Sequence, residues 1–377
     1  MLSGQIEALI ALRAGLEARG HSVQVISAFH PSQLEQDRRW DRDYGDSGGL
    51  VPRAGRIAGL IGTVAQKARG ADVLHFNLPT PAFSAVADAV QLAARVPVVV
   101  GFEAHLADVP AAARRLRAAA PFYAPRIIIN NGLVARLTAR RAACYVVSSN
   151  YQERELRTLG YEQERIAVIP NLIDRAKLKP WDRDEARREL GLPDGPLVAF
   201  LGHFHDVKGH DVLIEAFATV RREIPEARLA LAWSGIGSRY EVRVAVARAG
   251  IADRVIELGR LDVGQLFSAA DVVALPYRFS IGQAAYPGTV LEAMTIGVPL
   301  VTSSLPLLEE LTERGRTALL AHPGDPDDLA AQIVRLLRNP PLGAELVTAQ
   351  RAAMAERFDE AMLIDRYVAV YERAMSS

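Results

Sequence analysis

The chain has 377 residues, half of them hydrophobic, and its 44 Lys and Arg balance 44 Asp and Glu. This length exceeds what one core usually organises, so two domains are expected. Zero net charge gives no global attraction to nucleic acid, and no apolar run reaches the ~18 residues that a membrane span requires. A single cysteine, Cys144, and the lack of a signal-peptide pattern argue against a disulfide framework, so we predict a cytoplasmic protein.

Apolar runs of strand length alternate with helix-like runs, a pattern typical of βαβ units and parallel sheets. The first five predicted strands cover residues 23–27, 72–76, 96–102, 143–149 and 165–170. A polar, proline-containing linker with one helix follows over 171–196. Five more strands are predicted at 197–201, 227–233, 254–259, 271–276 and 298–303. The fold class is therefore α/β, with two successive domains that each have a parallel sheet.

The start of the chain departs from this pattern. The opening stretch SGQIEALIALRAGLEARGHSVQVIS is a helix-like run followed directly by a strand-like run. A domain of this type usually begins with a strand, so either the sequence starts late or the domain is built with a gap. If the native protein starts upstream, adding one strand is expected to raise stability and activity.

Three loops that follow predicted strands carry groups that favour an anion. Lys208 lies in GHFHDVKGHDV and offers a positive charge, and SGIG at 234–237 is predicted to be a Gly-x-Gly turn. A helix is predicted to begin near Gly288 and Thr289, where its amides and dipole favour negative charge. Together these loops suit a nucleotide that bears a diphosphate, although neither the Walker pattern nor Gly-x-Gly-x-x-Gly is present.

The single carboxylate in YPGTVLEAMTIGVPLVTSS, Glu292, has two interpretations. Thr289 is a good N-cap residue, and Thr289-x-x-Glu292 matches a capping box in which the glutamate stabilises the helix. Alternatively, the carboxylate holds a ligand. In both cases Gly297 is expected to end the helix.

The order of these segments resembles glycosyltransferase family 4. The motifs that carry the resemblance are SGQIEALIALRAGLEARGHSVQVIS, DVLHFNLP, RIAVIPNLID, FLGHFHDVKGHDVLIEAF, SGIG, RVIELG, DVVALP and YPGTVLEAMTIGVPLVTSS. The resemblance implies a GT-B fold of two facing Rossmann-like domains with a deep cleft between them. It places an acceptor domain at 1–174, a nucleotide-sugar domain at 175–358 and a helix that crosses back at 359–377.

The resemblance further implies a retaining, metal-independent transfer of a sugar from a nucleotide-sugar donor to an acceptor hydroxyl. The UDP- or GDP-sugar is then a substrate, and no cofactor is expected. Two alternatives stay open. One is a donor-binding protein with weak or no catalysis, such as a partner subunit, and the other is a nucleotide-sugar epimerase.

The donor-binding residues that the resemblance implies are Gly4, His203, Lys208, Gly235, Gln283, Gly288, Thr289 and Glu292. The sequence departs from the family at two of the expected positions. Ala284 stands where the family has a second glutamate, and the amide of Gln283 is a partial substitute. His203 stands where the family has a phosphate-binding arginine. A metal cluster of His203, His205 and His210 is a weaker alternative, because zinc sites show more defined spacing.

The catalytic residue implied for the first domain lies in VVVGFEAHLAD. His105 is the first candidate and Glu103 the second, and a loop histidine that only bonds to the backbone is the structural alternative.

An arginine-rich segment, Val109 to Gln152, contains seven arginines and no Asp or Glu. Such a run is usually a solvated helix face. It could instead contact an anionic membrane surface through residues 114–141, or a phosphorylated acceptor. A carbohydrate, a lipid-linked glycan and a small molecule all remain open as acceptors, and no nucleic-acid partner is expected.

Overall fold

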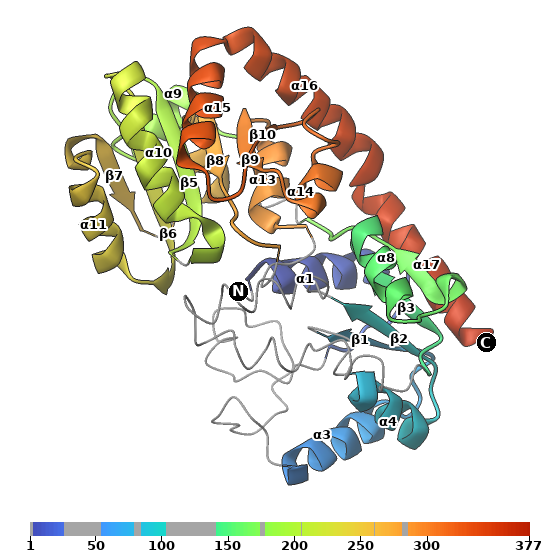
Figure 1. Cartoon of the computed structure of the whole chain (residues 1–377). Coiled ribbons are helices and arrows are strands. Elements are labelled where there is room, and N and C mark those ends of the chain that lie inside the picture. The colour runs from blue at the N-terminus through green and yellow to red at the C-terminus, as the bar shows by residue number, and fades with distance from the viewer. Residues whose placement is uncertain are drawn as a thin grey trace.

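The computed structural model describes residues 3–25, 54–78, 84–102, 141–173, 178–204, 206–259, 261–280 and 286–377. In this part of the chain two separate parallel sheets form, one in each half of the sequence (Figure 1). The predicted α/β class with two successive parallel sheets is therefore confirmed.

The N-terminal sheet has the order β1-β2-β3-β4, and all its pairings are parallel. Its strands are β1 (Leu74–Leu78), β2 (Val98–Phe102), β3 (Cys144–Val147) and β4 (Ile166–Val168). Helix α4 (Ser84–Ala94) packs through Ala87 beside Val98 and Val100. Helix α3 (Ala54–Lys67) lies next to α4 (Figure 1). Val98 and Val100 of β2 belong to the same core as Ala87, whereas Val99 between them belongs to the core on the other face of the sheet, as the alternation of side chains along a strand requires.

The strand predicted over 23–27 is wrong for residues 23–25, the part that the structure describes. Those residues follow helix α1 (Ser3–Glu17) without forming a strand. A strand needs a neighbour to satisfy its backbone groups, and no described strand pairs with this segment.

The C-terminal sheet has six parallel strands in the order β10-β9-β8-β5-β6-β7. They are β5 (Leu197–Phe204), β6 (Arg228–Gly237), β7 (Val255–Leu258), β8 (Val272–Leu275), β9 (Leu300–Ser303) and β10 (Leu319–Ala321). The central strands are buried on both faces, which explains their continuous apolar runs. Strand β10 has only three residues at the edge of the sheet and escaped prediction.

Helices cover both faces of the C-terminal sheet. They are α9 (Arg183–Glu189), α10 (His210–Glu223), α11 (Arg239–Arg248), α12 (Val263–Ala269), α13 (Gly288–Ile296), α14 (Pro306–Leu311), α15 (Pro326–Arg338) and α16 (Pro340–Arg357). Helix α10 packs beside α11 and α15, whereas α12 packs beside α9 and α13. Helix α9 is the helix predicted inside the linker.

The last helix, α17 (Glu360–Met375), returns to the N-terminal sheet (Figure 1). Leu363 and Ile364 share a core with Leu12 of α1 and Val99 of β2. A Cβ on Gly15 would lie 1.9 Å from the Cδ1 atom of Ile364, so glycine permits the close approach of α1 and α17.

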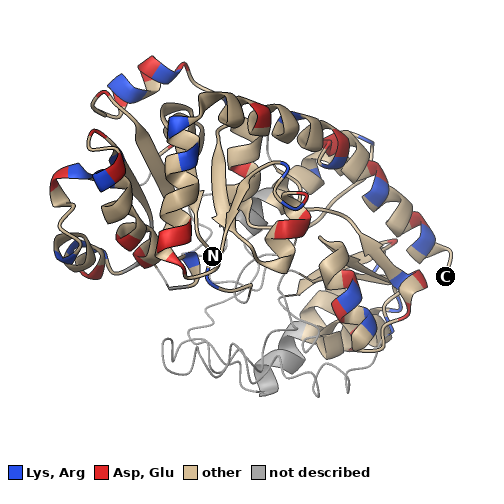
Figure 2. Cartoon of the chain, turned by 45° about the horizontal axis from the view of Figure 1, so that its top comes forward, with Lys and Arg blue, Asp and Glu red and all other residues tan. Residues whose placement is uncertain are grey.

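The positions of Lys and Arg and those of Asp and Glu alternate along the described helices (Figure 2). Within this part of the chain, no helix is both long enough and apolar enough to cross a bilayer.

Candidate nucleotide-sugar site

The candidate site lies at the carboxyl ends of the parallel strands of the C-terminal sheet, where open α/β sheets bind ligands. Strands β5 and β8 are hydrogen-bonded neighbours, so the loops that follow them meet. The amide of Arg278, after β8, donates to the carbonyl of Val207, after β5, at 3.1 Å. The guanidinium of Arg278 also pairs with Asp211 in the first turn of α10, at 2.9 Å.

Gly209 shapes the loop that carries Lys208. It has φ +67°, and a Cβ there would lie 1.8 Å from the carbonyl oxygen of Pro276. Both the backbone conformation and the space therefore require glycine. Gly209 adopts this left-handed conformation directly before α10, whereas Gly202 lies inside strand β5.

Lys208 is the cation of this loop. Its ammonium lies over the ring of Tyr277, 4.8 Å from the centroid, a cation–π geometry. Burial lowers the pKa of Lys208 to about 8, and the nearby carboxylate of Glu292 partly opposes this shift. The side chain is thus a poorly hydrated cation that an incoming anion would stabilise.

Helix α13 begins where it was predicted to, near Gly288 and Thr289, but its N-cap residue differs from the prediction. The helix begins at Gly288, Pro287 is its N-cap, and no side chain caps it. Thr289 lies inside the helix, where its hydroxyl is 2.6 Å from the hydroxyl of buried Tyr277. The predicted N-cap role of Thr289 is wrong, because its hydroxyl instead satisfies a buried phenol.

The capping-box interpretation of Glu292 is therefore wrong as well, since the box needs Thr289 as N-cap. Side chains of a helix point toward its N-terminus, and Glu292 follows this rule. Its Oε1 atom lies 3.9 Å from the place of a Cβ on Gly288. The carboxylate raises the pKa values of both Lys208 and Tyr277, which places it in the same electrostatic cluster.

Two further predicted residues lie on adjacent strands. His203 is a half-buried residue near the carboxyl end of β5. Gly235 was predicted to be in a turn, but β6 continues through it to Gly237, so the turn is wrong. The register between β5 and β6 shifts between Gly202 and Phe204, and the extra residues of β6 at this point belong to SGIG.

The remaining predicted site residues are placed as follows. Gly4 is in the first turn of α1. Glu103, His105 and Gln283 lie outside the described residues, as do Ala284 and His205 and most of the 114–141 segment. The ring of His210 packs against Phe204, with 5.4 Å between the ring centroids. Among the described residues, no three His, Cys, Asp or Glu side chains are grouped to hold a metal ion.

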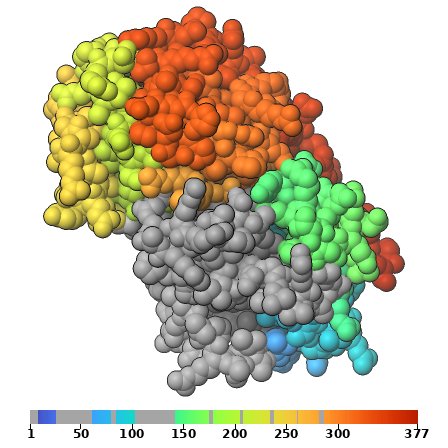
Figure 3. Space-filling view, viewed as in Figure 1, coloured from blue at the N-terminus to red at the C-terminus, as the bar shows by residue number. Residues whose placement is uncertain are grey.

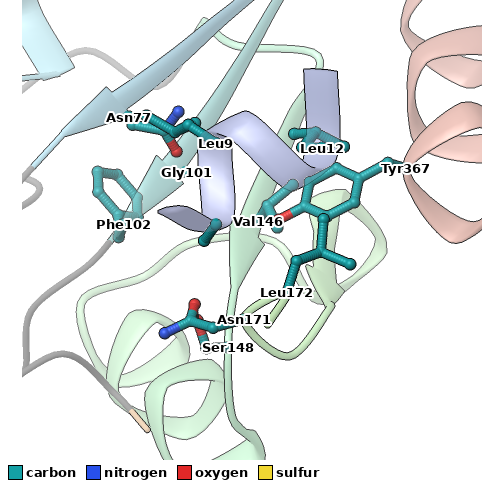
Figure 4. Close-up of a pocket in the computed structure, with 11 residues that line it drawn as sticks. Leu9, Leu12, Asn77, Gly101, Phe102, Val146, Ser148, Asn171, Leu172 and Tyr367 are labelled. Carbon is teal, nitrogen blue, oxygen red and sulfur yellow. The ribbon is translucent and has the colours of Figure 1, made fainter. Parts of the chain in front are cut away.

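A small cavity lies at the carboxyl ends of the N-terminal strands. Its lining includes Asn77 in the last part of β1, Ser148 after β3, and Asn171 in the segment that leads to the second domain. Ser148 and Asn171 lie together on one side of the cavity and Asn77 on the other (Figure 4). A Cβ on Gly101 would lie 2.8 Å from the Oδ1 atom of Asn77, so glycine leaves room for this amide. The space is about 50 Å³, enough to hold water.

His75 in β1 packs against the last helix, α17. Its Nδ1 atom lies 2.8 Å from the hydroxyl of Tyr371, and burial lowers its pKa to about 4. It is therefore a neutral histidine at pH 7 that contacts α17.

Three residues of this region were missed by the sequence analysis. Tyr277 stands directly after the predicted strand 271–276, and that position was a usable signal. Tyr286 and Glu310 form a hydrogen bond of 2.7 Å between two segments of the second domain, and no local pattern marks either residue.

Two protein-family models match the chain. Residues 3–177 match the model described as "Glycosyltransferase Family 4", and residues 195–339 match "Glycosyl transferases group 1". The two matches fall in the two domains and together span most of the chain.

Curated relatives match a part of the chain. A D-inositol 3-phosphate glycosyltransferase of Acidothermus cellulolyticus is 33% identical over 250 residues, which are 62% of this chain and 54% of that protein. A 2-deoxystreptamine glucosyltransferase of Streptomyces kanamyceticus is 30% identical over 255 residues, 64% of this chain and 63% of that protein. The chain spans about half the length of the first of these relatives.

Solved structures match almost the whole chain. Anabaena HepE in complex with UDP-glucose has a TM-score of 0.74 at 23% identity, covering 97% of this chain and 94% of that chain. A glycosyltransferase from Rickettsia africae has a TM-score of 0.77 at 15% identity, covering 100% and 97%. These likenesses confirm the predicted GT-B architecture.

Proposed function

We propose that this chain, which belongs to glycosyltransferase family 4, transfers a sugar from a nucleotide-sugar donor to an acceptor hydroxyl. In the proposal, the anomeric configuration is retained, no metal is required, and the donor binds against the second domain. The family membership is the premise, and the chemistry of the candidate site supports the rest.

One observation carries the proposal. The ammonium of Lys208, the N-terminus of α13 and the carboxylate of Glu292 converge at the carboxyl ends of β5 and β8. A nucleoside diphosphate is complementary to these groups: its negative charge suits Lys208 and the amides of the first helical turn, and its ribose diol suits Glu292.

The same groups would promote the reaction. Transfer breaks the bond between the anomeric carbon and the diphosphate oxygen, and a bond to the acceptor oxygen forms as its hydroxyl loses a proton. Negative charge grows on the departing diphosphate, where Lys208 and the amides at Gly288 and Thr289 would stabilise it. We further propose His105, with Glu103 as the alternative, as the catalytic residue of the first domain, and Gly4, His203, Gly235 and Gln283 as further contacts to the donor.

The comparisons guide the choice of substrates. HepE was solved with UDP-glucose, so UDP-glucose is the first donor that we propose, ahead of GDP-sugars. The names of the two curated relatives specify inositol 3-phosphate and 2-deoxystreptamine, which are both cyclohexane polyols. We therefore propose a small cyclic polyol as the first acceptor class to screen, ahead of lipid-linked glycans.

A donor screen followed by turnover tests the proposal. Thermal unfolding is measured with UDP, GDP and their glucose, N-acetylglucosamine and mannose derivatives, because a ligand at 100 times its Kd stabilises by about 2.7 kcal/mol. The best donor is then incubated with the acceptor panel, and release of nucleoside diphosphate is followed with and without EDTA. Absence of both stabilisation and release across the panel would reject the proposal.

A donor-binding protein with little catalysis is the second candidate, favoured by Ala284 at the position of the family's second glutamate. It predicts donor binding in the screen but no product with any acceptor or with cell extract. The substitution Ala284→Glu should then raise turnover while leaving UDP affinity within about threefold.

A further inference from the structure

The two domains are joined by a carboxylate that is separate from the candidate donor site. Glu310, on helix α14 of the second domain, reaches helix α8 (Asn150–Thr158) of the first. The two helices are side by side (Figure 1), and their surfaces meet directly in the space-filling view (Figure 3).

Glu310 accepts hydrogen bonds from both domains. From the first domain, the backbone amide of Asn150 donates to Oε1 at 2.8 Å, and that of Tyr151 donates to Oε2 at 2.9 Å. From the second, the hydroxyl of Tyr286 donates to Oε1 at 2.7 Å. Arg154 adds a weaker, exposed contact at 3.5 Å. The first amides of a helix have no partner within it, so a carboxylate is well suited to this position.

A second route connects the same places. The hydroxyl of Ser148 donates to the side-chain oxygen of Asn171 at 2.6 Å, and the amide of Asn171 donates to the backbone oxygen of Tyr286 at 3.5 Å. The segment that follows β3 is therefore connected to Tyr286 in two ways, once through Glu310 and once through Asn171. Tyr286 itself is buried, and its ring packs edge-to-face on Phe358, 6.0 Å between centroids.

Tyr286 stands directly before Pro287 and Gly288, where α13 begins. Its position sets where the N-terminus of that helix lies relative to the first domain. We propose that Glu310 is a positioning residue that aligns this part of the donor site with the first domain. The inference rests on the proposed function, since alignment matters when one domain holds the donor and the other the acceptor. A misplacement of about 1 Å is enough to reduce a rate on the order of a hundredfold.

Conservative variants isolate the positioning role. Every partner of Glu310 is a donor, so Glu310→Gln puts an amide NH₂ against a donor and breaks one side of the junction. Tyr286→Phe removes only the hydroxyl and keeps the ring on Phe358. Glu309→Gln is the matched control, because Glu309 is on the same helix but bonds to Ser304 inside the second domain.

The experiment measures kcat, donor KM, UDP affinity and hydrogen exchange of the peptides 148–156 and 286–291. We expect Glu310→Gln and Tyr286→Phe each to lower kcat roughly tenfold or more, with UDP affinity within about threefold of the parent. Exchange should rise in both peptides for Glu310→Gln. The double variant should be no worse than the poorer single variant, since both changes break one junction. Glu309→Gln should behave as the parent does.

Parental kcat in Glu310→Gln, or a lowered melting temperature with kcat unchanged, would overturn the positioning role and leave only a structural contact. Failure of the proposed function is distinguishable from this result, because the unmodified protein would then show no turnover of any donor. In that event hydrogen exchange still decides the inference: unchanged exchange of both peptides in Glu310→Gln overturns it, and a rise confined to the variant supports it.

Discussion

The ammonium of Lys208 lies 4.8 Å from the centre of the Tyr277 ring, although the two residues follow different strands of the C-terminal sheet. The hydroxyl of the same tyrosine bonds to Thr289 in α13 at 2.6 Å. Tyr277 thus joins the loop of Lys208 to the helix whose N-terminus faces the candidate site. The cation and the helix dipole keep a fixed relation to each other before any ligand arrives, which limits the reorganisation that binding requires.

Replacement of Lys208 by methionine should weaken UDP binding by roughly tenfold or more, because a hydrogen bond to a charged group contributes about 1.5–3 kcal/mol. Methionine keeps an unbranched apolar side chain over Tyr277, so the melting temperature without ligand should change little. Isothermal titration calorimetry with UDP is the measurement. Unchanged affinity would mean that the phosphate site lies elsewhere.

The pKa of about 8 for Lys208 predicts a pH dependence of ligand affinity. The protonated form binds the diphosphate, so affinity for UDP should fall as pH rises above about 8, approaching tenfold per pH unit. The stability of the ligand-free protein should change with pH in the opposite sense to the affinity. The folded pKa is below the ordinary 10.5, so the unfolded chain binds more protons between these values, and this group makes stability rise with pH there. The variant Lys208→Arg should remove the pH dependence of UDP affinity in this range, since arginine stays charged.

Replacement of Glu292 by glutamine should weaken UDP binding roughly tenfold if the carboxylate holds the ribose diol. The structure adds a second expectation, because Glu292 raises the pKa of Lys208. In Glu292→Gln the decline of affinity with pH should therefore begin at a lower pH than in the parent. Binding and pH dependence identical to those of the parent would remove Glu292 from the site.

The change Glu292→Ala separates ligand contact from helix capping. Because Thr289 is not the N-cap, loss of the carboxylate should cost much less than the ~1 kcal/mol typical of a lost cap. Urea unfolding of this variant without ligand measures that cost.

Gly209→Ala tests how strongly the loop conformation depends on glycine. A side chain at φ +67° costs about 1–2 kcal/mol, and contact with the carbonyl of Pro276 adds to it, so about 3 kcal/mol or more should be lost. Gly250→Ala is the control, since Gly250 also has φ +67° but no atom within 4 Å of the added carbon. The difference between the two variants in urea unfolding isolates the steric part. Equal losses would show that the loop moves away from Pro276 freely.

The sequence predicted the parts of the fold that depend on local pattern. Buried strands such as β8 are continuous apolar runs, and Gly297, with φ +82°, ends α13 where it was expected to. The failures came from contacts between distant segments. Thr289 has the chemistry of an N-cap, but its hydroxyl bonds to Tyr277, which only the folded sheet brings near.

The same distinction between local sequence pattern and contacts of distant segments applies to the candidate site. Lys208 was identified because it follows a strand, and its neighbour Tyr277 was overlooked although it does too. Glu310 could not be found, since its partner amides at Asn150 and Tyr151 are about 160 residues away. A junction of this kind leaves no periodicity or motif in a single sequence.

The packing of α17 on α1 has a consequence for biosynthesis. Leu12 and its neighbours are translated before the second domain, yet Leu363 and Ile364, which complete their core, are translated after it. At a synthesis rate of about 5–20 residues per second, the first domain waits tens of seconds with part of its apolar surface uncovered. The second domain, whose large core lies within residues 186–358, can complete its fold during that interval. A chain that stalls before Glu360 would therefore present the face of α1 and the N-terminal sheet to chaperones.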